Sequence, residues 1–447
     1  MADVTRLPPT IIHSARLVSA GETVPDAWVR FEGGRVVARG TRDGWRDALG
    51  ADGSAADSAA AKATGTDAAP ADSSVVDAAA AAASAAGATA DSPVVDATAD
   101  SSVVDATAAA ATVVDAAGRI LVPGFIDLHC HGAGGAAAED GEAALETMLD
   151  VHSAHGTTRT VCSLVSAPVE ALVPRLEAIA RLAARDPRVL GAHLEGPFLD
   201  DEFRGAHDPA ALRAPDDAAV DALLEASAGT LRQVTLAPEH DRGFAALHRF
   251  TGAGVAVAVG HSGADYALAL AAFDAGASIL THAFNGMRGI HHRQPGPVVA
   301  AMHAPHVTLE VINDGVHLHP DVVKLAFQGA PGRVALVTDA MAATGSADGS
   351  YVLGSLEVDV RDGVARIVET GSIAGSTLTQ DESLRRAVTD SGIPFEVAIA
   401  ALTTVPAAAI GRADDLGRLE VGYAADAVLL ADDLTVDAVW SAGRRVR

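Results

Sequence analysis

Histidine and acidic residues stand at the ends of several apolar segments. The segment ILVPGF (120–125) leads into DLHCHG (127–132), in which His129 and His131 are separated by a single residue. In a β-strand, residues i and i+2 point to the same side, so these two imidazoles would meet at one place. Imidazole and carboxylate groups are common ligands of Zn²⁺ and related divalent ions, which makes this pair a candidate metal site.

Later apolar segments end in the same residue types. They carry His193 and Glu195 in RVLGAHLEG, His261 in VAVAVGHS, His282 in SILTHAFN, His317 in INDGVHLHP and Asp339 in LVTDA. A single histidine near a strand end is more often a hydrogen-bonded structural residue than a ligand. Histidine or carboxylate at five or six strand ends of one domain is hard to obtain by chance, so we predict a divalent metal site.

The segments that carry these residues predict a (β/α)8 barrel of the TIM type. Apolar strands alternate with Ala- and Leu-rich helical stretches, and the strands are expected at 124–131, 157–165, 188–196, 233–239, 255–262, 278–285, 307–314 and 333–340. In such a barrel the functional groups lie at the C-terminal ends of the strands. A doubly wound sheet has a similar periodicity, but the glycine-rich fingerprint that usually follows its first strand is missing. A serine hydrolase is poorly supported, because no G-x-S-x-G motif occurs.

Both ends of the chain show a different pattern. Residues 10–40 and 417–447 contain short alternating strands, with a Gly-Gly turn at 33–34. We therefore expect a small β-sandwich domain built from both termini. The expected organisation is 1–50 for the first part of the small domain, 51–110 for an insert, 111–122 for a strand leading into the barrel, 123–398 for the barrel, and 399–447 for a C-terminal helix and the rest of the small domain.

The insert at 51–110 consists mainly of Ala, Asp, Ser and Thr, and it contains no aromatic residue, no Leu and no Ile. The unit ADSSVVDA (71–78) recurs as ADSPVVDA (90–97) and ADSSVVDA (99–106). Such a segment cannot bury enough apolar area to offset the entropy of ordering, so we predict a disordered loop. An acidic interaction segment is the functional alternative for the same composition.

Charge and composition exclude several classes of partner. The formal net charge of −26 argues against binding to nucleic acid, whose phosphates require Lys and Arg, and against an anionic membrane surface. Two cysteines, Cys130 and Cys162, make no disulfide framework. The N-terminal stretch lacks the basic and apolar regions of a signal peptide, and no segment approaches roughly 18 strongly apolar residues. We therefore expect a soluble, cytoplasmic protein.

A series of motifs resembles the N-acetylglucosamine-6-phosphate deacetylases of the amidohydrolase superfamily. In chain order the motifs are PGFIDLHCHG, HLEGPFL, GHSGADY, THAFNGM, INDGVHLHP, LVTDAMAATG and IAGSTLT. HLEGPF and THAFNGM are specific to this branch, whereas PGFIDLHCH marks only the superfamily. The resemblance covers the chain except the insert, and it implies a barrel with a flanking β-sandwich, usually as a homodimer. The implied reaction is hydrolysis of the acetamide of N-acetyl-D-glucosamine 6-phosphate, in amino-sugar catabolism and cell-wall sugar recycling.

The resemblance also implies a ligand set for the metal. Glu195, His261 and His282 correspond to the main ligands, and His129 with His131 would hold a second ion. One or two divalent ions per subunit are expected, with zinc as the first choice. These ligands leave a coordination position for water, whose pKa the cation would lower towards neutrality.

The lysines of the chain support this branch of the superfamily. Binuclear relatives bridge two metals with a carboxylated lysine of the barrel. Here the two lysines are Lys62, in the insert, and Lys324, in a predicted helix. By the resemblance, Glu195 takes the place of that lysine.

The catalytic and substrate-binding roles also follow from the resemblance. Asp339 corresponds to the general base, and His317 to the residue that polarises the carbonyl oxygen of the acetamide. Arg293 in HHRQPG corresponds to a phosphate-binding arginine, on a loop that reaches into the neighbouring subunit; Gln294 departs from the commonest form of that loop. The other residues that match substrate contacts are Ala206, His207, Asn285, Gly286, His317, Ile373, Ala374 and Gly375.

Two alternatives remain open at this point. The first is deacetylation of another N-acetylhexosamine phosphate, such as N-acetylgalactosamine 6-phosphate, because the contacts that distinguish sugar epimers are not visible in the sequence. The second is a barrel that binds a ligand without catalysis. Loss of Asp339 or His317 would mark such a protein, and both residues are present.

Deletion of residues 51–110 tests the interpretation of the insert. We expect the shortened chain to keep the melting temperature and the turnover of the full chain, because the deleted segment has no large apolar residues with which to pack. Differential scanning calorimetry and an activity assay check this. A large drop in melting temperature would show that the segment packs against the folded body.

Overall fold

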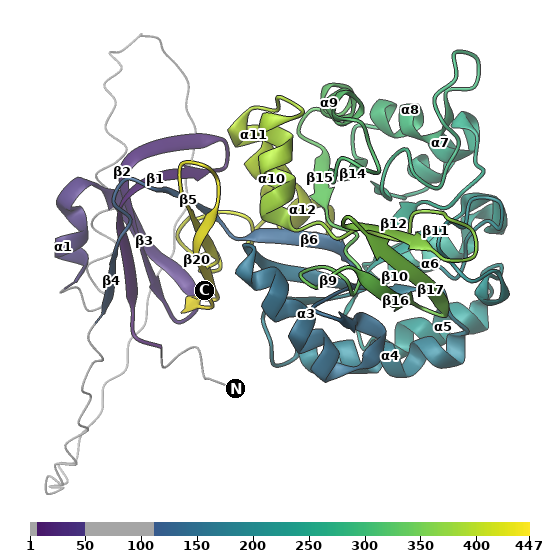
Figure 1. Ribbon diagram of the computed structural model, residues 1–447, viewed down its shortest axis with the longest axis horizontal. Helices are drawn as coiled ribbons and strands as arrows, with labels where there is room; N and C mark the ends of the chain where they lie inside the picture. Colours follow the sequence, from purple (N-terminus) through teal and green to yellow (C-terminus); the bar gives the residue numbers. More distant parts are fainter. Residues whose placement is uncertain (1–6, 50–110) are drawn as a thin grey trace, which may run out of the picture.

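A parallel barrel forms the larger part of the structure (Figure 1). The computed structural model describes residues 7–49 and 111–447. Neighbouring strands pair in parallel around the barrel in the order β6 (Phe125–Cys130), β9 (Thr157–Val165), β10 (Val189–Glu195), β11 (Leu231–Leu236), β12 (Ala256–Val259), β13 (Ile279–Leu280), β14 (Thr308–Ile312) and β15 (Val334–Val337). All eight predicted strands are confirmed, although β13 is only 2 residues long.

The first and last strands, β6 and β15, meet at their carboxyl ends. The backbone N–H of Asp339 donates to the carbonyl oxygen of His129 at 2.8 Å, and the N–H of His131 donates across the same edge. Asp127 strengthens the junction, because its carboxylate accepts from the Thr338 hydroxyl at 2.6 Å and from the Thr338 N–H at 3.2 Å. This edge therefore brings candidate ligands from the beginning and the end of the barrel together.

Helices cover the outside of the barrel. They are α3 (Glu142–Ala154), α4 (Val169–Ala183), α5 (Asp217–Ala226), α6 (Ala245–Gly252), α7 (Tyr266–Asp274), α8 (Gly296–His303), α9 (Pro320–Gly329) and α10 (Gln380–Thr389). In α4, the buried residues Leu172, Leu176 and Ile179 recur at helical spacing and pack into the main core. Asp216 caps α5 by accepting a hydrogen bond from the N–H of Ala219. The helices thus follow the amphipathic pattern of the sequence.

Strands from both ends of the chain form a second, mainly antiparallel sheet. Its order is β21 (Arg444–Arg445), β20 (Val436–Ser441), β19 (Ala427–Leu430), β5 (Ile120–Pro123), β1 (Thr10–Ser19), β2 (Glu22–Glu32) and β3 (Arg35–Thr41), and β4 (Thr112–Asp115) also pairs with β1. Its core contains Phe31 of β2, Leu121 of β5 and Trp440 of β20. The predicted β-domain made from both termini is confirmed. The predicted insert at 51–110 lies outside the described residues.

A buried ion pair links this sheet to the barrel. Arg159 on β9 donates to Asp426, which lies just before β19, through two hydrogen bonds of 2.6 and 3.0 Å. Both side chains are buried, and Asp426 also accepts from the N–H of Ala442 at 2.7 Å. Because each charge is compensated away from solvent, loss of one partner would leave the other buried and unpaired. The pair therefore fixes the sheet of the termini against the barrel.

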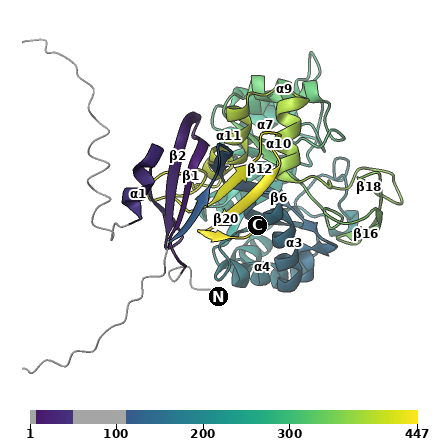
Figure 2. The same ribbon diagram turned by 60° about the vertical axis from the view of Figure 1, so that its left-hand side comes forward.

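A small antiparallel sheet interrupts the barrel pattern after β15, and the sequence did not predict it. It consists of β16 (Gly349–Leu353), β17 (Leu356–Arg361) and β18 (Val364–Ile367). Figure 2 shows β16 and β18 projecting from the barrel, away from the sheet of the termini. Leu353 and Val358 are buried in a cluster with Met341, which follows β15. This packing places the small sheet beside the carboxyl ends of the barrel strands.

The last helices bear on the expected domain organisation. We propose that the barrel extends past residue 398, because α11 (Phe395–Leu402) runs through that position and contacts β15 and β6, as α12 (Thr404–Ala409) also does. The other expected bounds stay predictions. No helix in the two described ranges is long and apolar enough to cross a membrane.

Candidate metal centre and active site

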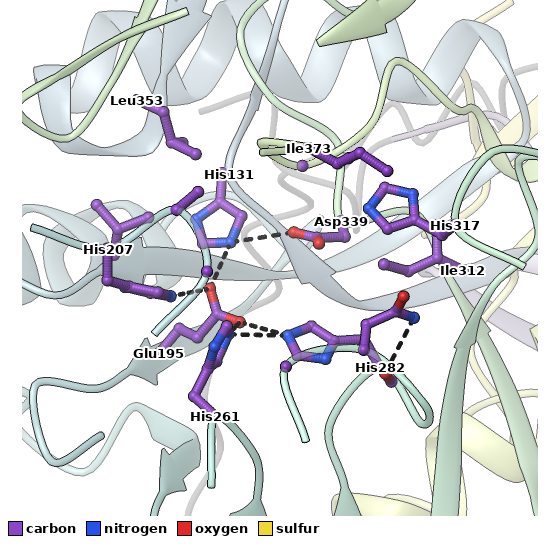
Figure 3. Close-up of a pocket in the computed structure, with 16 residues that line it drawn as sticks. His131, Glu195, His207, His261, His282, Ile312, His317, Asp339, Leu353 and Ile373 are labelled. Carbon is purple, nitrogen blue, oxygen red and sulfur yellow. Dashed lines mark hydrogen bonds and ion pairs between the residues drawn. The ribbon is translucent and has the colours of Figure 1, made fainter. Parts of the chain in front are cut away.

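Glu195 lies at the centre of a ring of histidines at the carboxyl ends of the barrel strands (Figure 3). Its Oε1 is 3.1 Å from Nε2 of His261 and 3.1 Å from Nε2 of His282. Its Oε2 is 3.2 Å from Nε2 of His131 and 3.4 Å from Nε2 of His207. Both carboxylate oxygens therefore face imidazole nitrogens. The interaction with His207, which was predicted only as a substrate contact, had no signal in the sequence.

His129, His131 and Asp339 form a second group around the same carboxylate. The Nε2 atoms of His129 and His131 are 3.0 Å apart, and they lie 3.4 and 3.3 Å from Oδ1 of Asp339. All of these side chains are buried. The potential ligand atoms thus form two clusters that share Glu195. One cluster is His129, His131, Glu195 and Asp339, and the other is Glu195, His261 and His282.

The protonation of His261 shows that these residues suit a cation. Its Nδ1 lies 2.8 Å from the carbonyl oxygen of Phe203, which can only accept, so Nδ1 carries the proton. In the neutral ring Nε2 then presents a lone pair, which faces a Glu195 oxygen at 3.1 Å and Nε2 of His282 at 2.9 Å. Lone pairs this close repel one another unless positive charge lies between them. Imidazole and carboxylate donors in this arrangement fit a divalent metal ion.

The charges of the cluster shift its pKa values strongly. Burial lowers the pKa of His131, but hydrogen bonds to Asp339 and Glu195 outweigh burial and raise it to about 9. Burial also opposes ionisation of Glu195, but the neighbouring His129 and His207 hold its pKa well below the usual range. The carboxylates therefore favour positive charge at the imidazole nitrogens. A divalent cation held by these residues would supply that charge at the same place.

Unusual backbone conformations occur at three of the potential ligands. His261, His282 and Asp339 have positive φ angles of 47°, 25° and 49°. Residues with a side chain rarely adopt this region, and it costs about 1–3 kcal/mol each, so such positions cluster at functional sites. Gly286 gives the His261 ring room, since a Cβ atom there would lie 2.9 Å from Nδ1 of His261. Backbone strain thus occurs where three strands end in potential metal ligands.

A cavity of about 180 Å³ opens above the cluster. The residues that line it are His131, Val165, Glu195, Gly205, Ala206, His207, His261, His282, Asn285, Gly286, Ile312, His317, Asp339, Leu353, Ile373 and Gly375. The lining thus includes most of the predicted substrate contacts. Val165, Gly205, Ile312 and Leu353 were missed, because an apolar residue or a glycine carries no chemical signal in the sequence. No Lys or Arg of the described residues lines the cavity.

Asp339 and His317 face this cavity from neighbouring strand ends. The Nδ1–H of His317 donates to Asp314 at 2.7 Å, and Asp314 also accepts from the N–H groups of Val316 and His317. Burial lowers the pKa of His317, but the bond to Asp314 outweighs burial and raises it. The ring can therefore hold a second proton on Nε2 and donate it to an oxygen in the cavity. Asp314 was not identified from the sequence, although it lies with His317 in the motif INDGVHLHP.

Two predicted substrate contacts lie outside the cavity lining. Ala374 is fully buried between Ile373 and Gly375, both of which line the cavity. Arg293 lies on an exposed loop between β13 and α8, where its guanidinium contacts His292 at 2.7 Å. Its predicted role therefore involves a ligand or a second chain that approaches this loop.

His193, whose strand position made it a candidate ligand, has hydroxyl partners at both ring nitrogens. Its Nδ1 lies 2.9 Å from the Ser163 hydroxyl and its Nε2 lies 2.8 Å from the Thr235 hydroxyl. Both ring nitrogens are therefore used in a polar layer beneath the metal cluster. Burial, and the neighbouring His129, lower its pKa well below the usual range, so the ring is neutral.

A third group of potential ligands is half-buried on a loop and on the short 3-10 helix Pro238–His240, and it has a structural explanation. It contains Asp200, Glu239 and His240. Glu239 accepts from the Ser262 hydroxyl at 2.7 Å and from the N–H of Gly263 at 2.6 Å. Asp200 lies 2.9 Å from Nε2 of His240. The group thus holds the turn that follows His261.

Comparison with known proteins agrees with the motifs and the geometry. The sequence model of the amidohydrolase family matches residues 120–446. The chain belongs to the amidohydrolase family. It is 37% identical over 330 residues to N-acetylglucosamine-6-phosphate deacetylase of Vibrio furnissii, covering 73% of this chain and 82% of that protein. It is also 37% identical over 337 residues to N-acetylgalactosamine-6-phosphate deacetylase of Escherichia coli O157:H7, covering 74% of this chain and 89% of that protein.

A solved structure gives the same result for the fold of this amidohydrolase. A variant of N-acetyl-D-glucosamine-6-phosphate deacetylase from Mycobacterium smegmatis, in complex with N-acetyl-D-glucosamine-6-phosphate, superposes with a TM-score of 0.79 and 35% sequence identity. The match covers 98% of this chain and 100% of that chain. The predicted family and fold are therefore confirmed, and the chain is a hydrolase of the deacetylase branch of the amidohydrolases.

Replacement of the shared carboxylate tests the metal centre. Glu195 belongs to both clusters, so we expect Glu195→Gln to contain less than about a tenth of the divalent metal of the unchanged protein, because an amide is a weaker ligand. Elemental mass spectrometry of the purified protein measures the metal content per chain. Glu202→Gln, on the exposed loop nearby, should keep the full metal content. Full metal content in Glu195→Gln would contradict the assignment.

Proposed function

We propose that this amidohydrolase removes acetate from N-acetyl-D-glucosamine 6-phosphate and leaves D-glucosamine 6-phosphate. The observation that carries the proposal is the placement of Asp339 and His317 in one cavity above the Glu195 cluster. The relatives from Vibrio furnissii and Mycobacterium smegmatis, whose names state this substrate, support it. An acid–base group and a donor to the carbonyl oxygen are the parts that amide hydrolysis needs.

Each side chain has a distinct task in this reaction. Asp339 would accept the proton of the attacking water and then deliver it to the departing amine nitrogen. Burial opposes ionisation of Asp339, but His129 and His131 lower its pKa, so the side chain is an ionised carboxylate with a free site for that proton. His317, held by Asp314 through Nδ1, would donate from Nε2 to the acetamide oxygen as negative charge develops there. A divalent ion held by the Glu195 clusters would supply Lewis acidity and lower the pKa of a water molecule.

The identity and number of the metal ions form part of the proposal. Zinc suits imidazole and carboxylate ligands at an open site. Two clusters sharing Glu195 support two ions per subunit, since each cluster supplies at least three potential ligand atoms. A cytoplasmic location stays a prediction from the sequence.

The phosphate group requires a cation from outside the cavity lining. A phosphate dianion needs charged or N–H donors, and no Lys or Arg of the described residues lines the cavity. We propose that Arg293, on its exposed loop, reaches the phosphate in the site of a second copy of the chain. This would make the active form a homodimer.

N-acetylgalactosamine 6-phosphate is a second candidate substrate. The relative from Escherichia coli O157:H7 carries that substrate in its name and is as similar in sequence as the relative from Vibrio furnissii. The two sugars differ in the orientation of one hydroxyl group. Comparison of kcat/KM for the two phosphorylated sugars decides between them.

The Asp339→Asn variant tests the proposed base. Asparagine cannot accept the proton, so we expect turnover to fall roughly 10²- to 10⁴-fold. Acetate release and metal content are measured on the same sample, so that metal loss is separated from loss of the base. Asp432→Asn, at a side chain that is 96% exposed, is the control and should change nothing. A variant that keeps more than about a tenth of normal turnover would show that Asp339 is not the proton carrier.

The Arg293→Ala variant tests phosphate recognition. Hydrogen bonds to charged groups contribute about 1.5–3 kcal/mol, so kcat/KM for the phosphorylated substrate should fall about 10- to 150-fold, mainly through KM. The low rate on unphosphorylated N-acetylglucosamine should barely change, because that substrate lacks the partner. Gln294→Ala, on the same exposed loop, is the matched control. Equal losses on both substrates would assign Arg293 to folding or assembly.

A further inference from the structure

A fully buried carboxylate lies beneath the metal cluster and has no role in the proposed reaction. Glu310 is on β14, two residues before Ile312, which lines the cavity, so both side chains point to the same side of the strand. The Glu310 side chain is 0% exposed. Its Oε1 accepts a hydrogen bond of 2.8 Å from the amide of Gln233, on β11. A single neutral donor is poor compensation for a buried carboxylate, so the other oxygen is decisive.

The second oxygen of Glu310 faces a metal ligand. Oε2 is 3.4 Å from Nδ1 of His129, an ion-pair contact, and neither atom forms a hydrogen bond among the described residues. The other nitrogen of this ring, Nε2, lies 3.0 Å from Nε2 of His131 and 3.4 Å from Oδ1 of Asp339. The imidazole of His129 therefore connects Glu310 below to the donor cluster above.

This contact determines which nitrogen of His129 can bind a cation. A proton on Nδ1 directed at Glu310 leaves a lone pair on Nε2, which points at the cluster. The neighbouring His193 cannot take the place of His129 in this contact, because both ring nitrogens of His193 already interact with Ser163 and Thr235. His193 also packs edge-on against His129 with ring centroids 4.6 Å apart, which restricts rotation of the His129 ring.

We propose that Glu310 is a positioning residue for one of two cation sites. It holds the Nδ1–H of His129, so that cation binding by His129, His131, Glu195 and Asp339 depends on it. The site made by Glu195, His261 and His282 does not, since the Glu310 side chain forms no hydrogen bond or ion pair with those residues. The inference rests on the metal centre of the proposed function, but it concerns binding and not turnover.

Titration of Co²⁺ into chelator-treated protein by isothermal calorimetry tests this proposal. The unchanged protein should bind two equivalents per chain. Glu310→Gln should keep one equivalent at the original affinity and bind the other about 10- to 100-fold more weakly, the usual loss when a partner of a ligating histidine is removed. Glutamine has the same shape and can still accept from Gln233, but it turns an amide donor towards His129. Because no substrate is used, failure of the deacetylase assignment would not alter the result.

Two further variants separate positioning from a structural effect. His129→Gln should weaken binding of the same Co²⁺ ion. The double variant Glu310→Gln/His129→Gln should bind that ion no more weakly than His129→Gln alone. Asp241→Asn removes another buried carboxylate, which accepts from Ala246 and Leu247 N–H groups, and should keep both equivalents. One equivalent in the unchanged protein would overturn the proposal. So would unchanged affinities in Glu310→Gln, loss of both equivalents in that variant, or additive losses in the double variant.

Discussion

The fold and the site both depend on how the negative charge of Glu195 is compensated. This carboxylate is buried, and its oxygens lie 3.1–3.4 Å from imidazole nitrogens. A buried charge of this kind is stable only when it is paired or coordinates a metal. The proton on Nδ1 of His261 leaves a lone pair facing Glu195, so neutral rings alone do not provide that compensation. A divalent cation would provide it, and the same cation would supply the Lewis acidity that the proposed amide hydrolysis needs.

The barrel can meet this requirement because several strand ends each carry one or two potential metal ligands. Parallel strands bring their carboxyl ends to one rim, and the junction of β6 with β15 places His129 and His131 beside Asp339. Left-handed backbone at His261, His282 and Asp339 turns their side chains inward. A polar layer that includes His193 and Glu310 supports the cluster from below, where barrels of this type usually carry branched apolar residues. The interior of this barrel therefore serves the metal site as well as the core.

The sequence predicted the parts of this arrangement that depend on local periodicity. Strand alternation alone placed His129 and His131 on one side, and apolar runs followed by His, Glu or Asp identified the rim. Contacts that depend on barrel closure or on loops were out of reach, because chain order does not determine which side chains meet. The carbonyl of Phe203 that orients His261, the side chain of Leu353 on β16 and the pairing of Glu310 with His129 are of this kind.

Metal-dependent deacetylation is tested most directly by acetate release from N-acetyl-D-glucosamine 6-phosphate. Proton NMR monitors this release in one preparation before and after metal removal. The metal content of each sample is measured in parallel. We expect release of acetate by the metal-loaded protein, loss of release after chelation and recovery when zinc is restored. Undiminished release after complete removal of metal would rule out metal-dependent deacetylation, and so would the absence of release from fully metal-loaded protein.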